Sequence, residues 1–139
     1  MFAPTIVAVF KHSKSVLIVD DNDLVRSALR GFLEKRTSLL VCGEAADGTE
    51  AVRVAKELEP GLVLMDLSMP QMNGIEAALL IRKAMPETRI VIFTMYSDLV
   101  GKALATKAGI DLVVPKAEGA EGLMSALRPL LDSSASASV

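Results

Sequence analysis

Short apolar runs alternate with longer amphipathic segments along most of the chain. The runs that we predict to be strands are Val16–Val19, Leu39–Val41 extending toward Glu44, Leu62–Met65, Ile90–Phe93 and Leu112–Val114. Three of these runs are continuously apolar rather than alternating, which is typical of strands covered on both faces. Cys42 and Gly43 interrupt the second run.

The longer segments have the apolar spacing of helices. They are Asp23–Arg36, Thr49–Leu58, Ile75–Ala84, Asp98–Ala108 and Glu121–Leu131. Pro60 with Gly61, then Pro86, then Gly109 mark the ends of the second, third and fourth helices. Five strands and five helices in strict alternation predict an α/β fold, a doubly wound parallel sheet with helices on both faces.

The two ends of the chain lie outside this pattern. Residues 1–14 begin with the apolar stretch MFAPTIVAVF, and basic residues follow it, which is the reverse of a secretory signal. We therefore expect an N-terminal extension, either a docked arm or an extra strand. Residues 132–139, DSSASASV, favour a flexible tail or the start of a linker, and a natural terminus and a truncated linker remain equally open. The predicted domain is then residues 15–131, with no room in this length for an effector domain.

Composition narrows the class of protein. The 139 residues fit one domain, and a hydrophobic share of 51% fits a well-filled core. The 15 Lys and Arg against 17 Asp and Glu give a net charge of −2, which argues against direct nucleic-acid binding. A single Cys excludes an internal disulfide, and no apolar stretch reaches the length of about 18 residues that a membrane span needs. We expect a cytoplasmic domain with no membrane contact.

Polar side chains follow four of the five predicted strands. Asp20 and Asp21 follow the first strand, Asp66 the third, Thr94 ends the fourth, and Lys116 follows the fifth. Ligands of such sheets bind outside the carboxyl ends of the strands, so we expect these side chains to converge there. Three crowded carboxylates repel one another, and a hard cation with oxygen ligands relieves the repulsion. Mg²⁺ suits this set better than Ca²⁺, which takes more protein oxygens.

A carboxylate beside Mg²⁺ is suited to phosphoryl chemistry, because it can attack phosphorus while the metal neutralises the phosphoryl oxygens. Lys116 could pair with a phosphoryl oxygen and Thr94 could hydrogen-bond another. Taken singly, each residue also has an ordinary explanation: a helix cap, an acidic loop, a strand end or an exposed lysine. Their occurrence together at successive strand ends favours the functional interpretation.

The motifs VLIVDDND, LVLMDLSMPQMNG, IVIFTMYSD and VVPK occur in that order. Asp21 and Asp66 are 45 residues apart, Thr94 follows 28 residues later, and Lys116 a further 22. In text, spacing and strand–helix order the chain resembles the receiver domain of bacterial two-component response regulators, over Ser15 to about Leu131. This resemblance implies the flavodoxin-like strand order 2-1-3-4-5.

The resemblance also implies a chemistry. Asp66 would be the phosphoacceptor, taking its phosphoryl group from a sensor histidine kinase or a phosphotransfer protein. Asp20 and Asp21 would hold Mg²⁺, Asp21 directly and Asp20 through water, together with Asp66 and the backbone carbonyl of Ser68. The domain would then be no enzyme beyond its own phosphorylation and slow self-dephosphorylation.

In the family, phosphorylation is passed on to a surface. Thr94 would swing toward the phosphoryl group and Lys116 would bind it. The surface formed by the helix predicted at Asp98–Ala108, the strand Leu112–Val114 and the helix Glu121–Leu131 would be a homodimer or partner face.

The sequence departs from the family pattern at several positions. The residue three before Lys116 is Val113 where the family usually has an aromatic residue, and valine cannot alternate between buried and exposed as a tyrosine ring does. The proline that usually follows the lysine is replaced by Ala117, while Pro115 precedes it. Met95 follows Thr94 where a small residue is usual, and its bulk could narrow access to the phosphate.

Two other functions are alternatives to the phosphoacceptor. The first is a non-phosphorylating docking or dimerisation module that keeps the fold. The second is a phosphatase with an aspartate nucleophile, which would need a second acid two residues after Asp66. Ser68 occupies that position, so the sequence disfavours the phosphatase.

Overall fold

The computed structural model describes residues 14–137, with side chains up to residue 131. The predicted N-terminal extension lies almost entirely outside the described residues. The strands are β1 Ser15–Val19, β2 Leu40–Ala45, β3 Leu62–Met65, β4 Arg89–Thr94 and β5 Leu112–Pro115. The α-helices are α2 Asp23–Arg36, α3 Gly48–Leu58, α4 Gly74–Ala84, α5 Lys102–Ala108 and α6 Gly119–Ala137, with short 3₁₀ turns η1 Ser97–Leu99 and η2 Lys116–Glu118.

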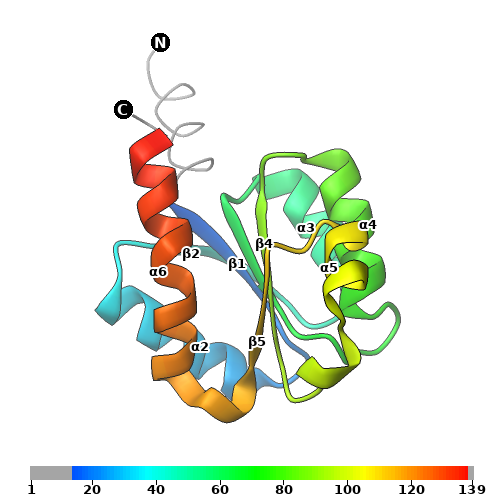
Figure 1. Cartoon of the computed structure of the whole chain (residues 1–139), viewed down its shortest axis with the longest axis horizontal. Helices are drawn as coiled ribbons and strands as arrows, with labels where there is room; N and C mark the ends of the chain where they lie inside the picture. The colour runs from blue at the N-terminus through cyan, green and yellow to red at the C-terminus, as the bar shows by residue number, and fades with distance from the viewer. Residues whose placement is uncertain (1–13, 138–139) are drawn as a thin grey trace.

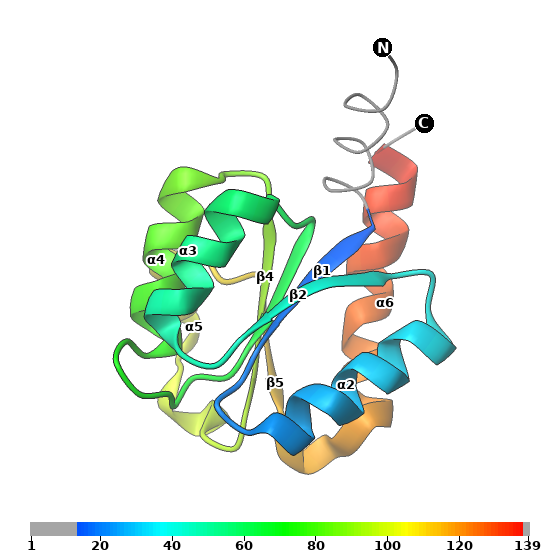
Figure 2. The same ribbon diagram turned by 180° about the vertical axis from the view of Figure 1, so that it is seen from behind.

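The five strands form one parallel sheet in the order β2-β1-β3-β4-β5, which confirms the predicted fold and strand order. Helices α2 and α6 cover one face of this sheet, and α3, α4 and α5 cover the other (Figures 1 and 2). Each face therefore has its own apolar core, and the sheet is buried between two helical layers.

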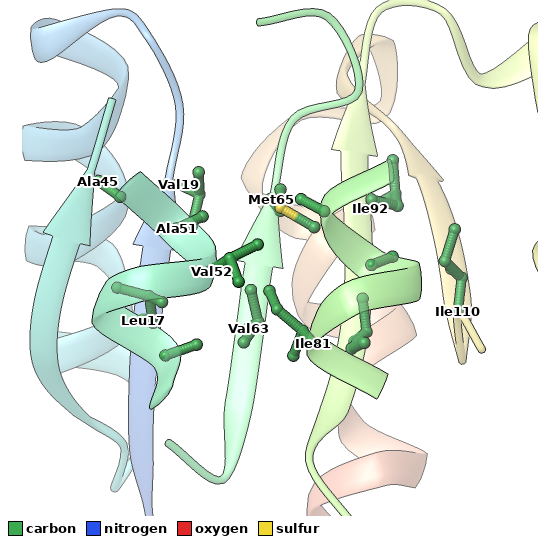
Figure 3. Close-up of a cluster of buried hydrophobic side chains, with 14 of the residues drawn as sticks. Leu17, Val19, Ala45, Ala51, Val52, Val63, Met65, Ile81, Ile92 and Ile110 are labelled. Carbon is green, nitrogen blue, oxygen red and sulfur yellow. The ribbon is translucent and has the colours of Figure 1, made fainter. Parts of the chain in front are cut away.

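Alternation along the strands divides the side chains between these two cores. Leu17, Val19, Val63, Met65 and Ile92 point toward α3 and α4, as Figure 3 shows. Their strand neighbours point the other way and pack with buried leucines of α2 and α6; they include Val16, Ile18, Leu64, Val91 and Val114. This two-sided burial explains why the strand runs are continuously apolar.

The second strand forms in spite of its interruption. Val16 pairs with Val41 and Leu17 with Gly43, so Cys42 is the extra residue of a bulge. A bulge adds one residue to a strand without ending its pairing. The strand therefore continues to Ala45, in agreement with the predicted extension toward Glu44.

The helix predicted over Asp98–Ala108 is wrong in its first half. The structure has η1, then an extended Val100 and Gly101, and α5 begins only at Lys102. Gly101 has φ −76° and ψ 164°, and a glycine weakens a helix through its backbone freedom. An apolar spacing across residues 98–108 does not reveal such a break.

The last helix is longer than predicted. It begins at Gly119, two residues before the expected start, and runs to Ala137 rather than ending at Leu131. The Ala and Ser residues after Leu131 permit helix continuation even though they add no apolar period. The interpretation of residues 132–139 as a linker remains a prediction.

Candidate functional site

Three carboxylates meet at the carboxyl edge of the sheet. One oxygen from each of Asp20, Asp21 and Asp66 lies within 4.8 Å of the others. Asp20 and Asp66 are buried, with exposed fractions of 2% and 8%, whereas Asp21 is exposed. Backbone hydrogen bonds set this arrangement, because the Asp66 amide donates to the Val19 carbonyl at 2.9 Å and the Asp20 amide to the Ala45 carbonyl at 3.1 Å.

The Lys116 ammonium joins two of these carboxylates. Its Nζ lies 2.7 Å from Asp20 Oδ2 and 3.3 Å from Asp66 Oδ2, and its side chain is mostly buried. Burial alone would lower the pKa of Lys116, but the hydrogen bond and charge of Asp20 and the charge of Asp66 outweigh it, so the pKa is raised. Lys116 is therefore a fixed positive charge in the site.

The loop between β1 and α2 is held by its own side chains. Asp20 Oδ1 accepts a hydrogen bond from the Asn22 amide at 2.9 Å. Asn22 caps α2, since its Oδ1 accepts from the amides of Leu24 and Val25 at 2.9 and 3.1 Å. The Asp-Asp-Asn run is thus both a helix cap and part of the acidic cluster, so the two interpretations of this run are compatible.

Hydrogen bonds of the loop between β3 and α4 hold Asp66 in place. Asp66 Oδ1 accepts from the Leu67 amide at 2.7 Å, and the Gly74 amide donates to the Leu67 carbonyl at 2.8 Å. A Cβ on Gly74 would lie 2.5 Å from the Asp66 carbonyl oxygen, so only glycine fits this close approach. Ser68 is exposed two residues beyond Asp66.

Thr94 ends β4 next to β3 and is fully buried. Its Oγ1 accepts a hydrogen bond from the Tyr96 amide at 3.1 Å. Met95 and Tyr96, which follow it, are 66% and 52% exposed. Val113 is half-buried and packs against the core beneath α3 and α4. An apolar groove lies beside Asp66; its lining residues are Leu67, Ser68, Asn73, Ile75, Tyr96, Leu99 and Val100.

The structure brings the predicted residues Asp20, Asp21 and Asp66 together and places Lys116 in ionic contact with two of them, Asp20 and Asp66. It places Thr94 on the same edge of the sheet. Because carboxylate oxygens are the ligands that Mg²⁺ prefers, the three aspartates fit a divalent cation of this type. This acidic triad is typical of a magnesium-binding receiver site.

Two residues at the site escape the sequence analysis. Arg26 on α2 donates to the Asp20 carbonyl oxygen at 2.6 Å and to Glu44 Oε1 on β2 at 2.9 Å. The only sequence sign of this network is the helical i, i+3 spacing of Asp23 and Arg26, which form an ion pair. The partner on β2 could not be found without the strand register.

Comparison with known proteins agrees with this geometry. The family described as "Response regulator receiver domain" matches residues 16–128. The chain is 46% identical over 94 residues to the uncharacterized transcriptional regulatory protein YhcZ of Bacillus subtilis (strain 168), covering 68% of this chain and 44% of YhcZ. It is 36% identical over 113 residues to the response regulator protein VraR of Staphylococcus aureus (strain Mu3), covering 81% of this chain and 54% of VraR.

A solved structure is also similar. The crystal structure of a two-component response regulator of the LuxR family from Aurantimonas sp. SI85-9A1 matches with a TM-score of 0.78 and 36% identity, over 87% of this chain and 86% of that one. The chain spans about half the length of the curated relatives it matches.

The chain belongs to the response regulator receiver domains. It is a receiver of a two-component system, a regulatory phosphoacceptor domain rather than an enzyme, and its class implies a histidine kinase as partner. In the described part of the chain, no helix has the length and apolar character to cross a membrane.

Proposed function

We propose that Asp66 accepts a phosphoryl group from the phosphohistidine of a sensor histidine kinase or phosphotransfer protein, in a magnesium-dependent cytoplasmic step. One observation carries this proposal. The Asp66 carboxylate lies in one cluster with Asp20 and Asp21, and its Oδ2 is 3.3 Å from the Lys116 ammonium. Among the described residues, no other group of three His, Cys, Asp or Glu side chains lies close enough together to hold a metal ion.

The transfer forms an oxygen–phosphorus bond and breaks a phosphorus–nitrogen bond. An Asp66 carboxylate oxygen attacks the phosphorus, and the donor imidazole leaves with the electron pair and takes a proton from solvent. Asp66 keeps 8% of its surface exposed to solvent, so the phosphoryl group would approach from solvent at the carboxyl edge of the sheet. Lys116 is already within reach of the acceptor oxygen and stabilises added negative charge there.

Asp20, Asp21, Asp66 and the backbone carbonyl of Ser68 are the groups that we assign to Mg²⁺. A bound Mg²⁺ neutralises charge on the phosphoryl oxygens. Asp21 is the most accessible of the three carboxylates, and we assign it to direct coordination, with Asp20 acting through water.

Phosphorylation adds a charge of about −1.5 to −2 at neutral pH. We assign Thr94 to a hydrogen bond in which its hydroxyl donates to the phosphoryl group; the same oxygen accepts from the Tyr96 amide at 3.1 Å. The adjoining loop and the α5–β5–α6 face would carry the change to a second copy or another partner. Val113 on β5 is half-buried against the core and has no ring to reorient, so we do not assign the output to a movement of this side chain.

The assignment is tested by incubating the protein with acetyl phosphate, with and without Mg²⁺, and measuring its intact mass. We expect one added phosphoryl group, dependent on Mg²⁺ and absent from Asp66→Asn. Asp98→Asn, which removes an exposed carboxylate of η1, is the matched control and should be labelled like the wild type.

Labelling of Asp66→Asn at the wild-type level would contradict the assignment. Failure of the wild type to bind millimolar Mg²⁺ or to be labelled would favour the non-phosphorylating docking module. Turnover of phosphate esters would instead revive the phosphatase.

A further inference from the structure

The Arg26 guanidinium is held in a mostly buried position between α2 and β2, with 15% of its side chain exposed. It makes three contacts on different elements. Nη1 donates to the Asp20 carbonyl oxygen at 2.6 Å, Nε donates to Glu44 Oε1 at 2.9 Å, and Nη2 pairs with Asp23. None of these contacts involves the carboxylate oxygens of the acidic cluster.

The Asp20 carbonyl oxygen belongs to the peptide unit that joins Asp20 to Asp21. Because a peptide unit is planar, a bond that fixes its oxygen also fixes the position of the next Cα. The same residue is held from its other side, where the Asp20 amide donates to the Ala45 carbonyl at 3.1 Å. The backbone is therefore held on both sides of the Asp20 Cα, by β2 before it and by Arg26 of α2 after it.

Asp21 depends on this backbone more than Asp20 does. The Asp20 carboxylate is fixed by the Asn22 amide and the Lys116 ammonium. Among the described residues no hydrogen bond or ion pair holds the exposed Asp21 carboxylate. The point from which this side chain extends is set by the backbone, which includes the peptide that Arg26 binds.

Glu44 in turn holds the Arg26 guanidinium in place. One oxygen of Glu44 accepts from Arg26, and the other accepts from Arg30 Nε at 2.8 Å. Arg30 contacts Glu44 and Glu34 but not the loop of the acidic cluster. Arg26 and Arg30 thus share an anchor, and only Arg26 extends from it to the loop.

We propose that Arg26 is a positioning residue for the metal site. It positions the Asp21 side chain by holding the Asp20–Asp21 peptide, and Glu44 holds Arg26 in place. This inference rests on the proposed function in assigning Asp20 and Asp21 to Mg²⁺. Groups outside the direct ligands of a metal orient those ligands, and their loss weakens metal binding by about 10- to 100-fold.

The direction of the effect separates positioning from simple charge. Removing a positive charge near a cation site favours cation binding by Coulomb's law. Loss of the Arg26 side chain should instead weaken Mg²⁺ binding if its role is to orient Asp21. Arg30 is the matched control, because its loss also removes one positive charge and one ion pair with Glu44.

The experiment measures the Mg²⁺ dissociation constant by isothermal titration calorimetry for the wild type, Arg26→Met and Arg30→Met, alongside the thermal midpoint without Mg²⁺. We expect the dissociation constant to rise about tenfold in Arg26→Met and to change by less than about twofold in Arg30→Met. Both variants should lose stability. Arg26→Lys, which keeps the charge but not the forked donors, should fold and bind Mg²⁺ with intermediate affinity.

An unchanged Mg²⁺ affinity in Arg26→Met, or an equal loss in Arg30→Met, would overturn the inference. If Arg26→Met does not fold, a wild-type affinity in Arg26→Lys would overturn it as well. Labelling of Asp66 with acetyl phosphate separates the two proposals: a wild type that is labelled while both arginine variants bind Mg²⁺ equally well refutes only the positioning role. A wild type that binds Mg²⁺, loses affinity in Arg26→Met and is never labelled refutes only the phosphoacceptor.

Discussion

The two sides of the acidic cluster are built differently. On the side of the β1–α2 loop, Asn22 caps α2 with two hydrogen bonds, and Arg26 ties the loop to Glu44 on β2. On the side of the β4–α5 connection, neither η1 nor α5 has a side-chain cap. Both sides expose apolar side chains, Leu24 on the first and Met95, Tyr96, Leu99 and Leu104 on the second. The second side differs in burial, because Ala108 is the one buried residue of η1 and α5.

The difference fits the two tasks that we propose for this site. A metal site needs ligands that are held in place before the ion arrives. A segment that answers phosphorylation needs a low cost of rearrangement, and few buried contacts and missing caps keep that cost low. The β1–α2 side therefore fits the proposed metal-binding role, and we call it the holding side. The β4–α5 side fits the proposed conformational response.

Lys116, which directly follows β5, contacts Asp20 in the β1–α2 loop and Asp66 after β3, and its loss should have the largest effect. Lys116→Met leaves Asp20 and Asp66 buried without a cation, so we expect a loss of about 3 kcal/mol in the free energy of unfolding. Mg²⁺ should restore more stability to this variant than to the wild type, because more repulsion is relieved. Urea unfolding with and without Mg²⁺ measures both quantities.

Lys107→Met on α5 is the control for Lys116→Met, since it removes an exposed lysine outside the cluster. It should change stability by less than about 0.5 kcal/mol. Equal losses in the two variants would mean that the carboxylates do not depend on Lys116.

The cap of α2 should have the next largest effect. Asn22→Ala removes the acceptor for the Leu24 and Val25 amides, and we expect a loss of about 1.5 kcal/mol, measured as a fall in the thermal midpoint. Asn22→Ser keeps a capping oxygen and should stay within about 0.5 kcal/mol of the wild type. If the alanine variant loses no more stability than the serine variant, the Asn22 cap does not stabilise the β1–α2 loop.

The contact between Arg26 and Glu44, which also holds the β1–α2 loop, is sensitive to pH. Burial alone would raise the pKa of Glu44, but the hydrogen bonds and charges of Arg30 and Arg26 outweigh it, so the pKa is lowered below its ordinary value of 4.5. A carboxyl group with a lowered folded-state pKa stabilises the fold above its unfolded pKa, and this stability is lost as the pH falls through the folded value.

Glu44→Gln should therefore cost about 1 kcal/mol at neutral pH, and the difference from the wild type should shrink as the pH falls below 4.5. Denaturant unfolding across pH 3 to 7 measures the difference, at about constant ionic strength. A gap that stays constant over this range would show that packing, and not the ionised carboxylate, accounts for the effect of Glu44.

The acidic cluster with Lys116 is more predictable from the sequence than the connection after β4. Asp20, Asp21, Asp66 and Lys116 follow apolar runs whose parallel pairing brings their ends together, so their convergence follows from the strand order alone. The Arg26–Glu44 contact could not be predicted, because it depends on how α2 rotates over β2 and on a bulge at Cys42.

The sequence predicts one helix over Asp98–Ala108 because the apolar residues fall at helical spacing. Spacing reports which face is buried, but it does not report where the backbone leaves the helical conformation. Gly101 was the only local sign of the break, and a single glycine within a helical pattern is tolerated often enough to be ambiguous. The parts of the site that sequence misses are those set by tertiary contacts between elements.

The smallest predicted effect bears most directly on the contrast between the two sides. Gly101 has extended dihedral angles, and a Cβ at this position would meet nothing within 4 Å. Asn at this position could accept from the first amides of α5, as Asn22 does in α2, so Gly101→Asn should gain about 0.5 kcal/mol. Hydrogen exchange should slow at residues 102–105 and stay unchanged at residues 23–26. Gly101→Ala, which restricts the unfolded chain in the same way but adds no acceptor, should slow exchange less than Gly101→Asn at residues 102–105. Equal slowing in both helices would mean that the two sides open together rather than separately.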